Sequence, residues 1–473
     1  MKNTKIIIFF FLLSFIKAQD PIEIDLSSNL ETTFYYTVEE KTIILSIDNG
    51  NYKLSGTSNI YNIKVSSSCT INLNSLTLAS PASTPILIEQ NKIVTLILFG
   101  VSSLADTALN QNEGVIYLNK EAKLTISGEG ILNIQPNKHM AINGTESTSL
   151  IVNSGTINIL STAIGVGGIY LRKEIIFNDG IYNFNINIKT SNDEKPPHAM
   201  DTEGSITLKK GQYNIISGEG KGLQAETNLY LGTKNDDNSN LKLNIETSNE
   251  AIEAKGIEIY SGTINILANG DGINSANDAC NSNCKGNCDC YMKFEGGIIQ
   301  INSEEDGLDS NGDITISGGQ LIVVGASSGD NQPIDQDGLL SITGGTVLAG
   351  GTSSMGGVQA TTNQAEGVYV KHVDAGAKLS IYNENNEKII EVEAPKPVEY
   401  LYFSYPGKSF TMKLNDNQVE TSDPSTVQGQ NPGPMNNPGD RPGPNNGTND
   451  EVPNNSYFIG LSYFLILFSF ILN

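Results

Sequence analysis

The sequence contains no tryptophan and little positive charge. Its 473 residues include 29 Lys and Arg against 52 Asp and Glu, which gives a formal net charge of −23. Such a chain is poorly suited to nucleic acid, because it has few cations with which to neutralise phosphates. Only 17% of the residues are charged, so the chain is not a disordered polyanion either. The three histidines lie in no zinc-protease or triad motif, and no nucleophile elbow or phosphate loop is present.

The N-terminus resembles a targeting signal. Residues 1–18 combine Lys2 and Lys5 with an apolar run, which predicts a cleaved secretory signal peptide, with an uncleaved membrane anchor as the alternative. Secretion would permit disulfides. It would also make Asn143, in the sequence Asn-Gly-Thr, a glycosylation site.

The C-terminus resembles an anchoring signal. Residues 457–473 are apolar, end without a basic flank and follow a Pro-, Asn- and Gly-rich stalk at 422–456. This arrangement predicts a GPI-attachment signal rather than a C-terminal transmembrane segment. Attachment is expected at Asn446, with Asn445 or Gly447 as alternatives. We therefore expect an extracellular protein held at the cell surface by a lipid anchor.

The body of the chain repeats. Apolar alternation, a Gly-containing turn and further alternation recur at 22- to 35-residue intervals, in copies that start at Leu124, Leu150, Ile175, Ile206, Leu229, Ile257, Met292, Ile314 and Leu340. A third short element lies between the copies, as in GLDSNG from Gly307. Three short strands per period predict an all-β fold, a parallel β-helix whose coils stack as a solenoid. We expect an N-terminal cap and first coils at 19–119, repeats at 120–377 and a C-terminal β cap at 378–421.

A column of amides follows the second strand of each coil. Alternation directs one residue of each strand inward and its neighbour outward, and the outward residues are Asn133, Asn158, Asn183, Asn214, Asn244 and Asn265. One interpretation is a polar ladder whose amides bond one another. The other is a flat amide surface that binds a sugar chain, through Asn158, Asn183, Asn214, Asn244 and Asn265.

Carboxylates gather on the third strand. Its outward column contains Asp201, Gln224, Glu253, Asn274, Asp309 and Asp335, and the column two residues on contains Glu203, Glu226, Lys255, Ala276, Asn311 and Asp337. Two charges about 4.8 Å apart repel by about 3–4 kcal/mol at an effective dielectric near 20. A bound cation would relieve this repulsion, and oxygen-only ligands favour Ca²⁺. We predict calcium at Asp271, Asp306, Asp309, Asp335 and Asp337, with Asp201, Glu203, Glu253 and Asn274 as weaker candidates. The alternative is a solvated acidic stripe.

Several runs resemble one known family. They are NYKLSGTSNIYNIKV (51–65), GDGIN (270–274), EDGLDSNGDITISGGQLIVVG (305–325) and PIDQDGLLSITGGTVLAGG (333–351). They are similar to the clostridial carbohydrate-binding, polysaccharide-lyase-like β-helix family, described as binding cellulose and acidic sugars. The resemblance implies a right-handed single-stranded parallel β-helix, Ca²⁺ held by stacked acids and a carbohydrate ligand. A cysteine-rich loop and a glycolipid tail, in place of a bacterial lipobox or dockerin, depart from the family pattern.

The cysteine-rich loop is an insertion at 278–290. It contains four thiols within eleven residues, at Cys280, Cys284, Cys288 and Cys290. A secreted chain favours two disulfides, while zinc is the alternative, and the pairing does not follow from the spacing. The remaining Cys69 is expected to be a buried free thiol.

Three functions fit these features. The favoured one is a monomeric cell-surface protein that binds plant-type or cell-wall polysaccharide, either acidic pectin through bridging Ca²⁺ or a neutral glucan on the amide face. A calcium-dependent pectate-type lyase is the second, and a structural or adhesive protein the third. A lyase needs a base, and Lys255 is the one weak catalytic candidate. A salt bridge from Lys255 to Glu226 or Glu253 is the favoured interpretation, so we lean against an enzyme.

Overall fold

The computed structural model describes residues 20–80, 84–107, 114–161, 163–186, 197–236, 240–276, 289–354 and 356–427. The predicted signal peptide, Asn446, the apolar tail and most of the stalk lie outside these ranges. No helix within the described residues is long and apolar enough to cross a membrane.

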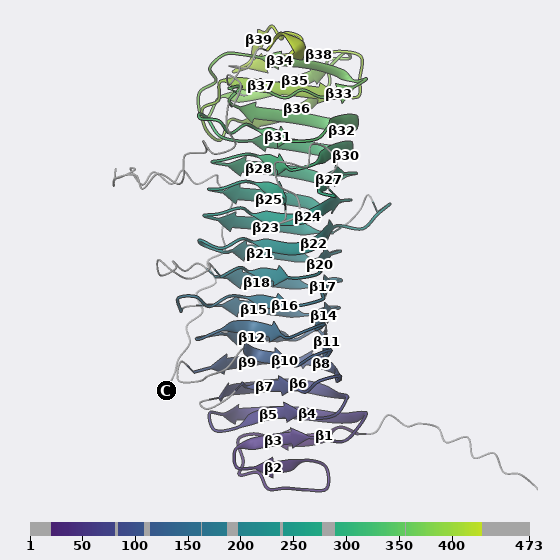
Figure 1. Ribbon diagram of the computed structural model, residues 1–473, viewed down its shortest axis with the longest axis vertical. Coiled ribbons are helices and arrows are strands. Elements are labelled where there is room, and N and C mark those ends of the chain that lie inside the picture. The colour runs from purple at the N-terminus through teal and green to yellow at the C-terminus, as the bar shows by residue number, and fades with distance from the viewer. Residues whose placement is uncertain are drawn as a thin grey trace, which may run out of the picture.

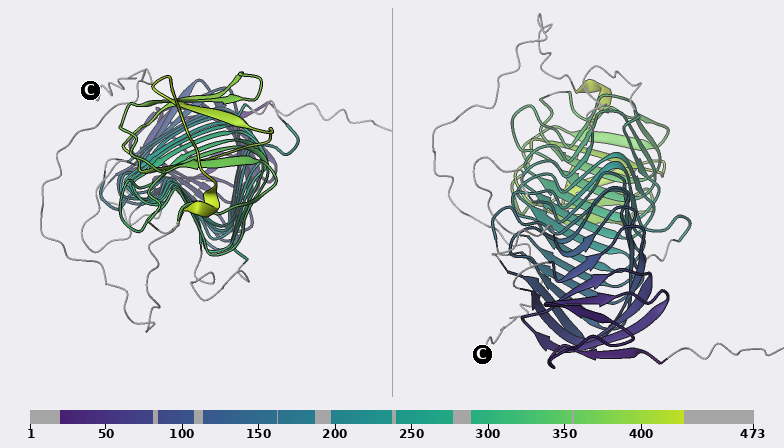
Figure 2. Two further views of the ribbon diagram at one scale, coloured as in Figure 1. Left: turned by 90° about the horizontal axis from the view of Figure 1, so that it is seen from above. Right: turned by 60° about the horizontal axis from the view of Figure 1, so that its bottom comes forward.

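The described chain is an all-β rod in which short strands stack along one axis (Figure 1). The strands of each coil pair in parallel with those of the next, so the rod has three stacks that surround one apolar core (Figure 2). The predicted all-β, solenoid-like parallel architecture is therefore confirmed, while its right-handed winding stays a prediction.

The first stack comprises β1 (Ile22–Asp25), β4 (Gly50–Ser58), β6 (Cys69–Ser80), β8 (Ile93–Phe99), β11 (Lys123–Gly128), β14 (Ser149–Val152), β17 (Glu174–Phe177), β20 (Ser205–Leu208), β22 (Leu223–Leu231), β24 (Ile252–Ile259), β27 (Tyr291–Phe294), β30 (Asp313–Val324), β32 (Leu340–Gly351) and β33 (Thr361–Thr362). The longest of these strands bend at a corner of the coil, so one part lies in the first stack and the other part in a neighbouring stack.

The second stack comprises parts of β4, β6, β30 and β32 together with β9 (Val101–Asp106), β12 (Ile131–Gln135), β15 (Thr156–Leu160), β18 (Ile181–Asn185), β21 (Gln212–Ile216), β23 (Lys242–Thr247), β25 (Thr263–Ala268) and β28 (Ile298–Ser303).

The third stack comprises β3 (Thr42–Leu45), β5 (Asn62–Val65), β7 (Ile86–Ile88), β10 (Gly114–Leu118), β13 (Met140–Gly144), β16 (Ile169–Leu171), β19 (Met200–Thr202), the first halves of β22 and β24, β26 (Ile273–Ser275), β29 (Leu308–Ser310) and β31 (Ile334–Gln336). At its N-terminal end β2 (Thr37–Glu39) pairs antiparallel with β3.

Glycine recurs where the first strand of a coil turns into the second. These turn glycines have φ between +77° and +135° in Gly155, Gly180, Gly211, Gly262, Gly297, Gly319 and Gly345. A Cβ at Gly211 would lie 2.6 Å from the carbonyl oxygen of Gly180, the equivalent residue one coil earlier. The recurrent glycine is thus required both by the backbone conformation and by the close stacking of turns.

The amide column of the second stack is a continuous hydrogen-bonded ladder. Asn133 is the first acceptor, and each later side-chain Nδ2 donates to the Oδ1 of the preceding coil at 2.8–3.0 Å, through Asn158, Asn183, Asn214, Asn244 and Asn265. The neighbouring inward residues, such as Tyr213 and Ile264, are fully buried. The ladder interpretation is therefore confirmed, and the sugar-binding interpretation of the same face stays a prediction.

The C-terminal segment covers the far end of the rod (Figure 1). β37 (Tyr400–Tyr405) pairs antiparallel with β32 and with β34 (Ala365–Tyr369). A separate sheet is formed by β36 (Lys388–Glu393), β35 (Lys378–Asn383), β38 (Phe410–Leu414) and β39 (Asn417–Val419), and a 3₁₀ turn follows at Pro424–Thr426.

The amide column becomes apolar where this C-terminal sheet packs. Gln300 continues the column in register, and Ile322 and Leu348 follow it. Both apolar residues belong to a second buried cluster with Leu379 and Ile381 of β35. Polar residues thus occupy the outward column on the open face and aliphatic residues the covered part.

We predict that Asn183→Ala destabilises the rod by about 1–2 kcal/mol, because it removes two ladder hydrogen bonds that each contribute about 0.5–1.5 kcal/mol. Urea denaturation followed by circular dichroism measures the effect. Gln212→Ala, on an exposed residue of the same face, is the matched control and should change stability far less. Equal stability of the two variants would contradict a contribution from the ladder.

Candidate metal and carbohydrate site

The third stack brings two residues of each coil into register. The strand column contains Asp201, Gln224, Glu253, Asn274, Asp309 and Asp335, each paired with the next. Three residues earlier, the turn column contains His198, Lys221, Glu250, Asp271, Asp306 and Gln332. Backbone bonds confirm the alignment, since the residue after Glu250, Asp271 or Asp306 donates its N–H to the carbonyl of the next turn residue.

We call the strand column and the turn column together the acid strip. Three carboxylates converge between two coils near its C-terminal end. One oxygen from each of Asp306, Asp309 and Asp335 lies within 4.8 Å of the other two, which makes this three-acid group a possible metal site. Asp337 lies two residues beyond Asp335 and is exposed, while Asp271 lies one coil earlier. Of the five residues predicted for calcium, the structure therefore groups three.

Asp271 and Asp306 also have a structural role. The Oδ1 of Asp271 accepts a hydrogen bond from the Asp306 N–H at 2.9 Å, and that of Asp306 accepts one from the Gln332 N–H at 2.5 Å. Each acid thus ties its turn to the equivalent turn of the next coil, and its second oxygen is not needed for this bond.

Two buried amides complete the surroundings of the acids. Asn274 and Gln332 are each 8% exposed. Their NH₂ groups donate to Asp271 Oδ2 (3.4 Å) and Asp335 Oδ1 (3.0 Å), respectively. Their carbonyl oxygens have no hydrogen-bond partner within the described residues. Buried acceptors normally find a partner, so these oxygens and the acids together fit a hard cation that prefers oxygen ligands.

The pKa values of the acids reflect this crowding. Burial, with the charges of Asp309 and Asp306, raises the pKa of Asp271 to about 8. Burial raises the pKa of Asp306 to about 7, and the charge of Asp335 adds to the rise. The hydrogen bond from the Gln332 N–H lowers this pKa but does not outweigh burial. Burial and the charge of Asp335 likewise raise the pKa of Asp309 to about 7. Without a cation, Asp271, Asp306 and Asp309 therefore retain protons near neutral pH.

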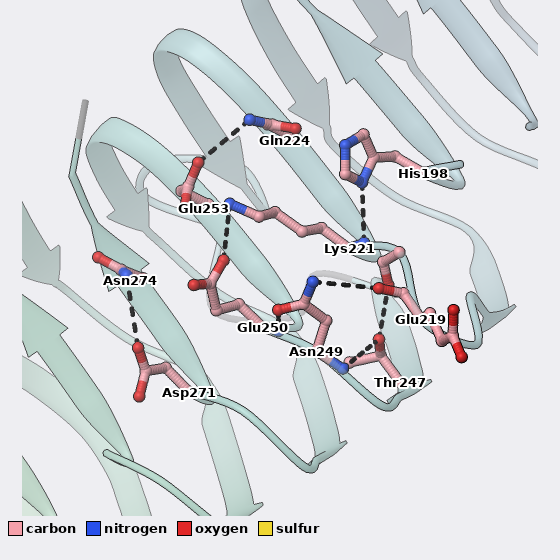
Figure 3. A network of polar contacts seen from close by, with 11 residues as sticks. His198, Glu219, Lys221, Gln224, Thr247, Asn249, Glu250, Glu253, Asp271 and Asn274 are labelled. Carbon is pink, nitrogen blue, oxygen red and sulfur yellow. Dashed lines mark hydrogen bonds and ion pairs between the residues drawn. The ribbon is translucent and has the colours of Figure 1, made fainter. Parts of the chain in front are cut away.

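A lysine neutralises the acids two coils earlier (Figure 3). The Nζ of Lys221 lies 2.7 Å from Glu250 Oε2 and also contacts Glu253 Oε2. Burial opposes the charge of Lys221, but the two carboxylates outweigh it and raise the pKa of Lys221. Gln224 Nε2 donates to Glu253 Oε1 at 3.1 Å. Lys221 is therefore held in its charged form and is unsuited to act as a base.

The sequence analysis favoured a salt bridge from Lys255 to Glu226 or Glu253, and this partner was wrong, while a catalytic role of Lys255 stays a prediction. Lys255 pairs with Asp289 at 3.0 Å rather than with Glu226 or Glu253, while Lys221 reaches the acids from the turn. Aligning KGLQ (221–224) and EAIE (250–253) with DGLD (306–309) would have found both Lys221 and Glu250.

Two of the weaker metal candidates, Asp201 and Glu203, lie apart from the three-acid group. Asp201 is four coils from Asp309, about 19 Å at about 4.8 Å per coil. Glu203 contacts the guanidinium of Arg172 and accepts a hydrogen bond from the Tyr170 hydroxyl at 3.2 Å. Asp201 and Glu203 are thus not part of the three-acid group, whereas Asn274 is adjacent to it.

The predicted modification sites are only partly described. Asn143 lies on β13 in the third stack, in register with Tyr117 and Tyr170, and its glycosylation stays a prediction. Cys290 is buried at 1% exposure, while Cys280, Cys284 and Cys288 lie outside the described residues, so disulfide pairing stays a prediction. Cys69 is a buried free thiol, as expected, and burial raises its pKa to about 12.

A family model described as a carbohydrate-binding domain-containing protein matches residues 39–237 and again residues 238–429. The chain belongs to this carbohydrate-binding family. The two matches cover most of the rod and divide it between β22 and β23. The resemblance noted in the sequence is thereby confirmed at the level of the family.

Comparison with solved structures aligns this member of the carbohydrate-binding family with the polysaccharide lyase-like protein from C. thermocellum, a gadolinium derivative. The two are 16% identical with a TM-score of 0.32, over 63% of this chain and 96% of that one. A search of curated proteins finds no match.

We predict that, in EGTA, stability falls as pH rises from about 5 to 8. The raised carboxyl pKa values mean that the folded state holds more protons than the unfolded state in this window, so unfolding becomes easier as pH increases. Thermal melting at several pH values measures the slope.

Asp309→Asn should flatten that slope, because it removes one of the three titrating acids. This variant also separates the contribution of the acids from that of His372. Hydrogen bonds to Glu399 and Asp374 raise the pKa of His372, so His372 likewise lowers stability as pH rises. A slope that is zero or positive in the unsubstituted protein would contradict the assignment.

Proposed function

We propose that this chain binds polysaccharide at a cell surface with Ca²⁺ held by Asp306, Asp309 and Asp335. The observation that carries the proposal is the convergence of three carboxylates within 4.8 Å, beside buried amide oxygens that have no hydrogen-bond partner within the described residues. The family supports a carbohydrate ligand. The chemistry of the donors supports calcium, which takes six to eight oxygen ligands in flexible geometry.

The net charge explains why a cation would be needed for an acidic ligand. A chain with a net charge of −23 repels a polyuronate. A divalent cation held by the three-acid group, with Asn274 or Gln332 as further oxygen donors, would supply positive charge and coordination positions for carboxylates of the sugar. Acidic polysaccharide of the pectin type is therefore the favoured ligand.

The amide ladder supports a neutral glucan as a second ligand. Each ladder amide spends one N–H and its carbonyl oxygen on its neighbours, which leaves its second N–H as a donor. Asn214 and Asn244 are exposed, so a row of donors faces outward along β21 and β23. Such a row suits the hydroxyl groups of an uncharged chain and needs no calcium.

The same proposal covers the biological setting. We infer that the coils wind in a right-handed sense, that the chain is secreted and monomeric, and that a GPI anchor at Asn446 attaches it to the membrane. Residues 422–456 would then hold the rod away from the lipid surface, since a Pro- and Gly-rich segment acts as an extended spacer.

We predict that Asp309→Ala combined with Asp335→Ala lowers calcium-dependent retention on polygalacturonate by about 100-fold or more, since even outer-shell changes at metal sites cost roughly 10–100-fold. Pull-down at fixed calcium, with an EGTA arm, measures retention, and circular dichroism checks that the strands remain. Asp201→Ala with Glu203→Ala, in the same stack but outside the group, is the matched control. Unchanged retention of the first variant would reject the site.

On a neutral glucan, we expect retention to survive EGTA. Asn158→Ala with Asn244→Ala should then weaken it, while the Asp309 and Asp335 variant should not. The same pull-down with a neutral glucan measures both effects. Glucan retention that disappears in EGTA would argue against the amide face as an independent surface.

A further inference from the structure

The acid strip repeats the geometry of the three-acid group two coils earlier. That group consists of a turn residue, the strand residue of the same coil and the strand residue of the next, in Asp306, Asp309 and Asp335. The corresponding trio is Glu250, Glu253 and Asn274. It places oxygen donors at the equivalent positions of the coil, with an amide in place of the third acid.

This second trio holds the ammonium group of Lys221. Lys221 contacts a carboxylate oxygen of both Glu250 and Glu253 (Figure 3). All three side chains are mostly enclosed, at 16%, 21% and 17% exposure. The lysine comes from the turn of the preceding coil. The backbone N–H of Lys221 donates a hydrogen bond to the imidazole Nδ1 of His198 (2.9 Å), which holds this turn in place.

Two buried amides lie on the coils next to Glu253. The carbonyl oxygens of Asn274 and Gln224 are buried without a hydrogen-bond partner in the described part of the chain, and both residues are 8% exposed. They flank Glu253 on the two neighbouring coils. These two amides are an observation independent of the acids: each has a buried carbonyl oxygen without a partner in the described part of the chain. A turn of the amide group would bring the oxygen of Gln224 toward Glu253. The same turn in Asn274 would bring its oxygen toward Asp271.

We infer that Lys221 is a built-in counter-ion that takes the place of a divalent cation in the acid strip, and that loss of its charge opens a second cation site at Glu250, Glu253 and Asn274. The ammonium is a fixed single charge, whereas no lysine of the described ranges pairs with the three-acid group, which is left for an exchangeable ion. Lys221 therefore limits how far cation binding extends along the strip. This inference extends the proposed calcium function, but it is tested separately from it.

The test is the number of Ca²⁺ ions bound by the full chain, measured by isothermal titration calorimetry with Tb³⁺ luminescence as a second readout. Lys221→Met keeps an unbranched apolar stem and removes the ammonium. We expect it to bind one ion per chain more than the unsubstituted protein. Lys255→Met, which removes an equal charge from the pair with exposed Asp289, is the matched control and should bind no additional ion.

The readout is a difference, so it does not depend on the three-acid group. If the unsubstituted protein binds no ion and Lys221→Met binds one, the proposed calcium site fails and this inference stands. Adding Glu253→Gln to Lys221→Met should abolish the extra ion. The inference is overturned if Lys221→Met binds the same number of ions as the unsubstituted protein.

Folding gives a further readout. A Lys221→Met chain that folds only with calcium, under conditions where the unsubstituted chain folds in EGTA, would support the inference, because the ion then replaces the lost charge. A Lys221→Met chain that fails to fold with or without calcium, while Lys221→Met with Glu253→Gln folds, would overturn it. In that case the lysine serves the fold alone.

Discussion

The stacking of parallel strands at about 4.8 Å is the constraint on which the rest of the structure depends. Because each coil repeats the path of the previous one, a side chain at a given position touches its own equivalent above and below. Any property of that residue is then multiplied along the axis. Amides gain from this arrangement, since each can donate to one neighbour and accept from the other, as Asn183 does between Asn158 and Asn214. Stacked carboxylates destabilise the rod instead, because stacking brings like charges together.

The acid strip shows two ways of meeting that cost and one place where it is not met. Backbone N–H groups satisfy one oxygen each of Asp271 and Asp306. Lys221 supplies a positive charge to Glu250 and Glu253. At the three-acid group neither device is sufficient, and burial with mutual repulsion keeps the pKa values of Asp306 and Asp309 near neutrality. The electrostatic need for a cation is therefore concentrated at one place on a strip that is acidic along most of its length.

Much of the fold could be predicted because residues of the same type recur at equivalent positions of successive coils. The turn glycines, the alternation around Asn158 and Asn183, and the matched acids Asp309 and Asp335 all follow from one coil length, and the observed register pairs them. What could not be predicted lies where side chains cross between coils. Long side chains from the turns decide the pairing, so Lys221 reaches the acids while Lys255 turns to Asp289. Burial was equally hidden, because alternation places Asn274 outward although it is 8% exposed.

The second and third stacks present different surfaces to a ligand, neutral amides on one and carboxylates on the other. The second stack presents neutral donors that are already ordered by their ladder, so an uncharged chain would find them preorganised at little entropic cost. The third stack presents repelling charges that become favourable only when an ion joins them, so under the proposed function binding there would depend on calcium and pH. Because the two faces are built from the same coils, a polymer aligned with the axis meets a repeating surface on either side. Under the proposed function, a difference between acidic and neutral ligands would then arise from which side chain the repeat stacks, not from a difference in fold.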